Sequence, residues 1–319
     1  MTEDQDNDVL PDPTSDVFTA SLWSNPKNEN LLLSFINAVR TNAGMSPIVQ
    51  ATVLNPFNIK EFVASKGIVL DVRAKDEHNH LYDVEVQTSN HPAFPNRTLD
   101  YWSETYAAQL KSGMEYKELR HVTSIILTKF QIFRQLKNIH TIFMIMAKEN
   151  PSVVLTDAFQ MHFLRLYEII QGHLELLEYL CRDLRDWFLF FAFGGNKTEA
   201  EMSQLTDNNP IILEAYEEMQ RFYANPETRE KAIERHRFLV DYNLGMSSSK
   251  EEGKAEGIAE SIVYYLKHRF GSVPQELENR LLAMSDVVRL DSLRDLSYDC
   301  DSLEEFNNGL ALQGDCAIL

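Results

Sequence analysis

Two carboxylates and one amide lie on neighbouring apolar segments of the sequence. Asp71 belongs to the segment 67–75, and Glu85 and Gln87 belong to the segment 80–88. The four polar residues between the segments have the length of a turn that joins adjacent antiparallel strands. Because side chains alternate along a strand, the three side chains are predicted to converge on one face of a hairpin. Such a group can hold a hard divalent cation beside a phosphate.

The same spacing also fits an ordinary solvated sheet face, since acidic hairpins are common. Asp71 and Glu85 would then pair with Arg73 or Lys75. The order of the surrounding elements favours the functional interpretation. A helix and a strand precede the hairpin, and a helix and a strand follow it, which is an α/β order with one mixed sheet.

Hydrophobic periodicity predicts the elements that position these residues. Strands are expected at residues 48–54, 67–75, 80–88, 122–130, 141–147 and 158–166. Helices are expected from residues 12–16 onward and at residues 29–40, 96–112, 173–190, 211–224 and 226–242. Residues 245–250 indicate a flexible break. The last segment is predicted to form two or three short helices, interrupted at residues 271–274.

These elements predict four parts of the chain. They are a disordered acidic tail (1–12), an α/β domain with a helical second half (13–245), a charged linker or loose helix (246–257) and a small helical module (258–319).

Composition constrains the function classes only weakly. The net charge is −18, but residues 13–150 carry 14 bases and 13 acids, whereas residues 151–319 carry 16 bases and 30 acids. Charge therefore neither supports nor excludes a nucleic-acid partner. Three widely spaced cysteines and an acidic first segment without an apolar run predict a cytoplasmic protein without a membrane segment.

Several stretches resemble the Rpn group of recombination-promoting nucleases, which are transposases of the PD-(D/E)XK nuclease superfamily. In chain order they are residues 12–18, 30–38, 70–72, 82–87, 97–102, 109–116, 155–157 and 161–163. The resemblance covers about residues 12–245 and implies a PD-(D/E)XK restriction-endonuclease-like mixed sheet flanked by helices. Each motif is short, and the evidence lies in their order.

The resemblance implies a metal-dependent DNA endonuclease. Asp71 and Glu85 would bind Mg²⁺ (or Mn²⁺) together with the backbone carbonyl of Val86, and Gln87 would take the place of the superfamily's lysine. Asp16 would be an additional acidic contributor, although it fits a helix-capping carboxylate equally well. Arg97 fits a contact to a DNA phosphate or a solvated position equally well.

Two functions remain open at this level. The first is a Mg²⁺-dependent endonuclease linked to recombination or mobile elements. The second is a catalytically degenerate module that binds nucleic acid or protein, because Gln87 is neutral and the lysine that often follows Phe18 in the family is missing. The acidic C-terminal helices are expected to mediate homo-oligomerisation or autoinhibition and not DNA contact.

Overall fold

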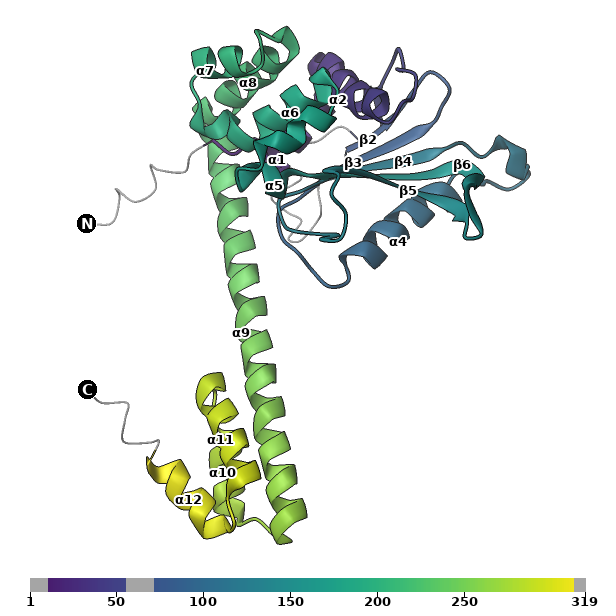
Figure 1. The fold of residues 1–319 in the computed structure, drawn as a ribbon. Helices are drawn as coiled ribbons and strands as arrows, with labels where there is room; N and C mark the ends of the chain where they lie inside the picture. The colour runs from purple at the N-terminus through teal and green to yellow at the C-terminus, as the bar shows by residue number, and fades with distance from the viewer. Residues whose placement is uncertain (1–10, 56–71, 313–319) are drawn as a thin grey trace. The chain divides into compact units, whose positions relative to one another are not determined.

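A computed structural model describes residues 11–55 and 72–312 of the chain (Figure 1). The chain divides into two compact units, Met1–His236 and Arg237–Leu319. The first unit contains a sheet with helices on both faces, and the second unit is helical.

The described part of the first unit contains one six-stranded mixed sheet, as the sequence predicts. Its strands lie in the order β1-β2-β3-β4-β6-β5. Their bounds are β1 Thr52–Val53, β2 Val72–Lys75, β3 Leu81–Gln87, β4 Val122–Thr128, β5 His140–Ala147 and β6 Asn150–Arg165. β3 and β6 flank β4 in parallel orientation, and the remaining pairs are antiparallel.

Helices cover the two faces of this sheet unequally. On one face lie α1 (Asp16–Ser24), α2 (Glu29–Asn42), α6 (Arg182–Phe193) and α8 (Pro210–Ala224). On the other face lies α4 (Phe94–Ala107), as Figure 1 shows. The alternation of β3 follows from this packing, because Tyr82, Val84 and Val86 belong to the large core beneath α1 and α2.

Two aromatic contacts hold α4 against the sheet. The indole Nε1 of Trp102 donates a hydrogen bond of 2.9 Å to the carbonyl of Val122 at the start of β4. Its ring also packs edge to face against the ring of Phe159 in β6, with 4.7 Å between the ring centres. At the other end of the helix, Phe94 is buried against Phe130 and Phe163. These anchors fix the side chains of the first turn of α4 over the carboxyl end of β3.

The helical part departs from the sequence prediction at residues 173–190. That segment is not one helix: α5 (Leu166–Ile170) ends two residues before Gly172, whose φ of +95° favours glycine. A 3₁₀ helix, Leu174–Tyr179, and an extended Cys181 precede α6. The amide of Cys181 donates to Asn42 Oδ1 at 2.7 Å, which fixes this break against the end of α2.

The predicted flexible break at 245–250 is wrong, whereas residues 246–257 are helical, which is one of the two forms predicted for them. A single helix, α9 (Pro226–Phe270), runs through both. Residues 250–260 are rich in Lys, Glu and Ala, which are good helix formers. Ala255, Ile258 and Ala259 also share a helix face buried in the core of the second unit, so burial offsets the cost of the intervening glycines.

The remaining α-helices of the described residues are α7 (Glu199–Leu205) in the first unit and three short helices in the second: α10 (Gln275–Leu282), α11 (Val287–Asp299) and α12 (Leu303–Leu312). The break between α9 and α10 lies at residues 271–274, as predicted, where Gly271 has a φ of +85°. Among the described helices, none combines the length and apolar character needed to cross a membrane.

Candidate active site

Glu85 and Gln87 lie at the carboxyl end of β3, on the face that α4 covers. They are 4% and 8% exposed, respectively, so the structure places a carboxylate and an amide inside the protein. Burying a charged carboxylate is costly unless polar or cationic groups compensate it. Both side chains point away from the large core because the alternate residues of β3 occupy that core.

Gln87 links the carboxylate to a cation on α4. Its Nε2 donates a hydrogen bond to Glu85 Oε1, and its Oε1 accepts a 2.8 Å hydrogen bond from Arg97 Nη2. These two partners fix the orientation of the amide. Arg97 Nη2 also lies 3.8 Å from Glu85 Oε1, an ion pair longer than a charge-assisted hydrogen bond. The three side chains therefore form one connected group.

Arg97 stands at the boundary between this group and solvent. Its side chain is 34% exposed, and its guanidinium carbon lies 5.5 Å from the centre of the Phe94 ring. Because Phe94 is itself buried, the guanidinium has a fixed support from which it can reach an anion outside. The sequence left Arg97 open between phosphate contact and solvent, and the structure places it in contact with Gln87.

The second predicted carboxylate, Asp71, lies outside the described residues. Val72 and Val84 are cross-strand partners, and they are the sequence neighbours of Asp71 and Glu85. Within the described residues, no three His, Cys, Asp or Glu side chains come together in a way that could hold a metal ion.

The backbone of Val86 suits its predicted part in metal binding. Leu81 N donates to His121 O, and Lys129 N donates to Gln87 O, so the odd-numbered residues of β3 direct their backbone groups to β4. The carbonyl of Val86 consequently points to the opposite side, toward β2. A buried carboxylate and a carbonyl oxygen are donors that Mg²⁺ and Mn²⁺ prefer, so the described residues fit such an ion.

Asp16 makes a different set of contacts. Its Oδ2 lies 2.7 Å from Arg235 Nε of α9, and its Oδ1 accepts from the amide of Val17 at 2.9 Å. The carboxylate therefore binds an amide in the first turn of α1 and joins α1 to α9, while the N-cap of α1 is Ser15.

Two further polar residues share the face of Glu85. Asp83, two residues earlier on β3, is buried, and strand alternation already indicated its position. Thr128 is the partner of Gln87 in β4; it is fully buried, and its hydroxyl has no hydrogen-bond partner among the described residues. No sequence pattern indicated Thr128, because the parallel pairing of β3 with β4 is not a local property.

A second buried polar group lies on the opposite face of the sheet. Asn42 Nδ2 lies 2.7 Å from His140 Nδ1, His140 Nε2 lies 2.9 Å from His162 Nδ1, and His162 Nε2 lies 3.4 Å from Gln160 Oε1. Because the Cys181 amide donates to Asn42 Oδ1, the Asn42 amide nitrogen donates to His140. Each imidazole then accepts at Nδ1 and donates at Nε2, so both rings are neutral.

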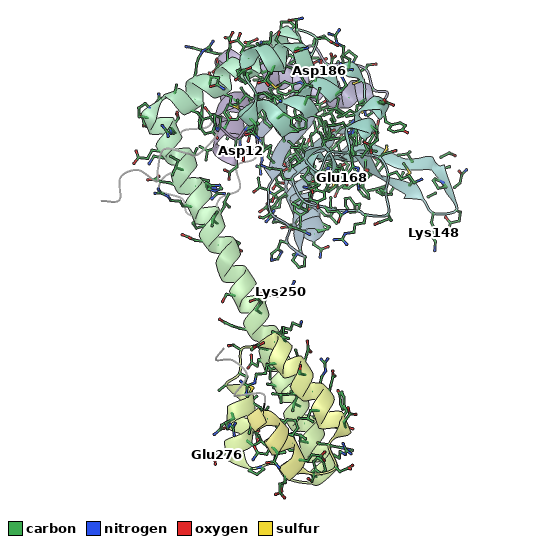
Figure 2. All side chains as sticks on the ribbon, turned by 60° about the vertical axis from the view of Figure 1, so that its left-hand side comes forward. Asp12, Lys148, Glu168, Asp186, Lys250 and Glu276 are labelled. Carbon is green, nitrogen blue, oxygen red and sulfur yellow. The ribbon has the colours of Figure 1, made fainter. Side chains whose placement is uncertain are left out.

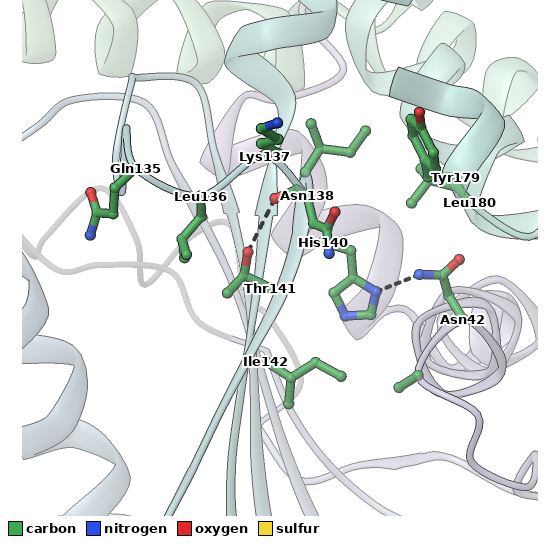
Figure 3. A pocket seen from close by; sticks show the side chains of 12 residues that line it. Asn42, Gln135, Leu136, Lys137, Asn138, His140, Thr141, Ile142, Tyr179 and Leu180 are labelled. Atoms are coloured by element: carbon green, nitrogen blue, oxygen red, sulfur yellow. Dashed lines mark hydrogen bonds between the residues drawn. The ribbon is translucent and has the colours of Figure 1, made fainter. Parts of the chain in front are cut away.

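Burial lowers the pKa of His140 to about 4 and, with His140 and Arg40 nearby, the pKa of His162 to about 3. His140 also lines a cavity of about 780 Å³ between β5 and the end of α2 (Figure 3). Both nitrogens of His140 are already engaged, so the ring has no free lone pair for catalysis.

Comparison with known proteins gives one match. The family model described as PD-(D/E)XK nuclease family transposase matches residues 13–249. Neither the curated proteins nor the solved structures give a match to this chain.

Proposed function

The chain belongs to the PD-(D/E)XK nuclease family transposases, and we propose that it is a divalent-metal-dependent endonuclease that hydrolyses phosphodiester bonds in DNA during recombination. One observation carries this proposal. Glu85, Gln87 and Arg97 form a connected, largely buried group at the carboxyl end of β3, where a carboxylate, an amide and a cation can all act on one phosphate.

In this proposal Asp71, Glu85 and the Val86 carbonyl would hold Mg²⁺ or Mn²⁺. Lewis-acid stabilisation of the phosphate and a lower pKa of the attacking water are the chemistry that such an ion would supply when bound. The protein contributes the position of its oxygen donors on β3 and the exclusion of bulk water by α4. Burial matters here because electrostatic interactions are stronger where water is excluded.

Gln87 and Arg97 together take the role of the superfamily's lysine. Gln87 can orient a water molecule or a phosphate oxygen by hydrogen bonding, but it carries no charge. Arg97 supplies the missing positive charge from α4, and its planar fork suits the paired oxygens of a phosphate. The contact between Arg97 and Gln87 keeps the guanidinium at the site before DNA binds.

Asp16 is proposed as a weaker, additional acidic contributor. Because Arg235 already binds its carboxylate, its contribution is through the placement of α1 and is smaller than that of Glu85.

The test is cleavage of a supercoiled plasmid with Mg²⁺, Mn²⁺ or EDTA. We expect metal-dependent nicking by the wild type and a loss of at least ~10²-fold in Glu85→Gln, comparable to removing one group that stabilises the transition state. Glu104→Gln is the matched control, because Glu104 is an exposed acid on α4 and its replacement should leave nicking unchanged.

The second candidate function is a degenerate module that binds DNA or protein without cleavage. The observation that favours it lies in the first helix, where Thr19 follows Phe18 and the lysine often found there in the family is missing. Thr19 is buried, and its hydroxyl donates to the carbonyls of Ser15 and Asp16. Absence of metal-dependent cleavage in the wild type, with Glu85→Gln binding DNA as the wild type does, would select this function.

Three further details of the proposal, namely the substrate, the compartment and the oligomerisation surface, rest on the sequence. DNA is the proposed substrate, the cytoplasm is the proposed compartment, and the C-terminal helices are proposed to mediate homo-oligomerisation.

A further inference from the structure

The loop that joins β4 to β5, residues 129–139, carries three basic residues and no acid: Lys129, Arg134 and Lys137. Lys129 forms an ion pair with Asp12 at 3.2 Å. Arg134 and Lys137 are exposed, and within the described part of the chain their side chains form no ion pair or hydrogen bond. The β4–β5 loop therefore presents two unpaired positive charges to solvent.

The β4–β5 loop packs on the face of the sheet that carries the candidate active site. Gln87 of β3, Thr128 of β4 and Arg165 of β6 are successive partners across the two parallel pairs, so their side chains share the α4 face. The ring of Phe133 lies on the same face, with its centre 5.1 Å from that of Phe163. Neighbouring strands are about 4.8 Å apart, so the backbone of Arg165 lies about 10 Å from that of Gln87.

A buried arginine fixes the conformation of this loop. The guanidinium of Arg165 is 2% exposed and donates to the carbonyl of Leu136 at 2.9 Å. It also donates to the carbonyls of Ile132 and Phe133, both at 3.1 Å. Its charge is balanced by Glu168 of α5 at 3.3 Å, which Figure 2 labels. Because these carbonyls face inward and Phe133 is held at a φ of +52°, the side chains between Phe133 and Leu136 are exposed on a fixed backbone.

We propose that the β4–β5 loop binds the phosphate backbone of DNA, with Arg134 and Lys137 as the contacts. The inference rests on the proposed function, which places one phosphate of the same strand at Glu85 and Arg97. Guanidinium and ammonium groups both bind phosphate oxygens through charge-assisted hydrogen bonds. Successive nucleotides of a strand rise about 3.4 Å along the helix axis, so a separation of about 10 Å corresponds to phosphates about three nucleotides away.

The other side chains of the loop favour a phosphate backbone over an acidic protein. The exposed polar residues besides the cations are the amides Gln131, Gln135 and Asn138, which commonly bond phosphate and sugar oxygens. The large apolar residues of the loop are buried or half-buried. A protein interface normally has an apolar centre, and this surface offers none.

The experiment measures binding of a short fluorescent DNA duplex to the full-length chain by anisotropy, in EDTA and at several salt concentrations. Binding is then observed without metal-dependent cleavage. We expect Arg134→Gln and Lys137→Gln each to weaken binding about fivefold at physiological salt, and the double variant to lose both contributions. The slope of log K against log salt should become shallower by about 0.9 for each lost phosphate contact.

Lys148→Gln is the matched control, because it removes the same charge from another exposed lysine. Lys148 lies in the turn between β5 and β6, at the opposite end of β6 from Arg165 (Figure 2). This variant should bind DNA like the wild type. An equal loss in Lys148→Gln would show that only net charge matters and would overturn the inference, and so would wild-type affinity and salt slope in the double variant.

Plasmid cleavage by the same proteins separates this inference from the endonuclease proposal. A wild type that binds DNA through the loop but cleaves with neither Mg²⁺ nor Mn²⁺ would contradict the endonuclease and support the loop as a DNA-binding surface. Metal-dependent cleavage by the wild type, with a double variant that binds and cleaves equally well, would contradict the role of the loop and leave the endonuclease standing.

Discussion

The two faces of one sheet each bury a polar group, and the two groups are built on different principles. On the face opposite α4, the Asn42–His140–His162 chain is neutral, and each imidazole nitrogen has a partner. On the α4 face, Glu85, Gln87 and Arg97 combine a negative, a neutral and a positive side chain, and the guanidinium is partly open to solvent.

The difference shows which buried polar group is suited to chemistry. A neutral group of side chains in which every hydrogen-bond donor and acceptor is paired rigidifies the fold, but it has no donor or acceptor left for a ligand. A buried carboxylate beside a guanidinium at 3.8 Å can exchange its contacts when a metal ion and a phosphate arrive. The histidine chain is therefore structural, and the Glu85 group is the candidate site.

The largest expected effect tests the cationic member of the candidate site. Arg97→Ala should lower metal-dependent cleavage by about 10²-fold, because a positive charge at the phosphate is lost. Arg97→Lys should recover part of the rate, since lysine keeps the charge but lacks the planar fork. Arg120→Ala, which removes an exposed arginine outside the Glu85 group, should cleave like the wild type. Full activity of Arg97→Ala would remove the functional distinction between the two faces.

The next effect tests the structural role of the histidine chain. Both folded-state pKa values lie below the ordinary value near 6.5, so the unfolded state binds more protons between about pH 4 and 6.5. Stability is therefore complete above pH 6.5 and falls as the pH decreases, with a slope of up to ~1.4 kcal/mol per pH unit for each ring.

Urea unfolding at several pH values measures this slope. In His162→Gln we expect a lower free energy of unfolding at pH 7 and a shallower decline toward pH 4. His173→Gln is the control, because His173 is largely exposed. If His162→Gln kept the full wild-type slope, the buried chain would not be the source of the pH dependence.

The smallest effect concerns the carboxylate of Asp16, which already has hydrogen-bond partners, as the histidines do, and so resembles them more than the candidate site. Asp16→Asn should lower stability by about 1–2 kcal/mol through loss of its charged hydrogen bond to Arg235. Cleavage should fall less than tenfold, and Arg235→Gln should show the same pattern. A loss of cleavage in Asp16→Asn as large as in Glu85→Gln, with Arg235→Gln active, would place Asp16 in the catalytic group.

Local patterns predicted a large part of this arrangement. Alternation along β3 was enough to place Glu85 and Gln87 on one face, and the order of strands and helices was enough for a mixed sheet. The contact between Arg97 and Gln87 was not predictable, because it depends on where Trp102 and Phe94 hold α4 over the sheet. The same holds for the His140–His162 contact, which joins two strands in a register that no short segment encodes.

The continuity of α9 was missed for a related reason. Glycines and serines near residues 245–257 weaken helix propensity locally, whereas burial of Ala255 and Ile258 in the second unit's core is a tertiary effect.

The two faces also differ in when the growing chain can complete them. The aromatic core beneath α4 uses residues from Phe94 to Phe163, so it can close once β6 has been synthesised. On the other face Phe18 packs against Phe222, and the Tyr223 hydroxyl donates to the carbonyl of Asp12 across 211 residues. At ordinary synthesis rates, the residues that pack against α1 are therefore synthesised on the order of 10–40 s after α1 itself. During that interval Val17, Phe18 and Leu22 lack their final cover, and α1 is the segment where a chaperone would be of most use.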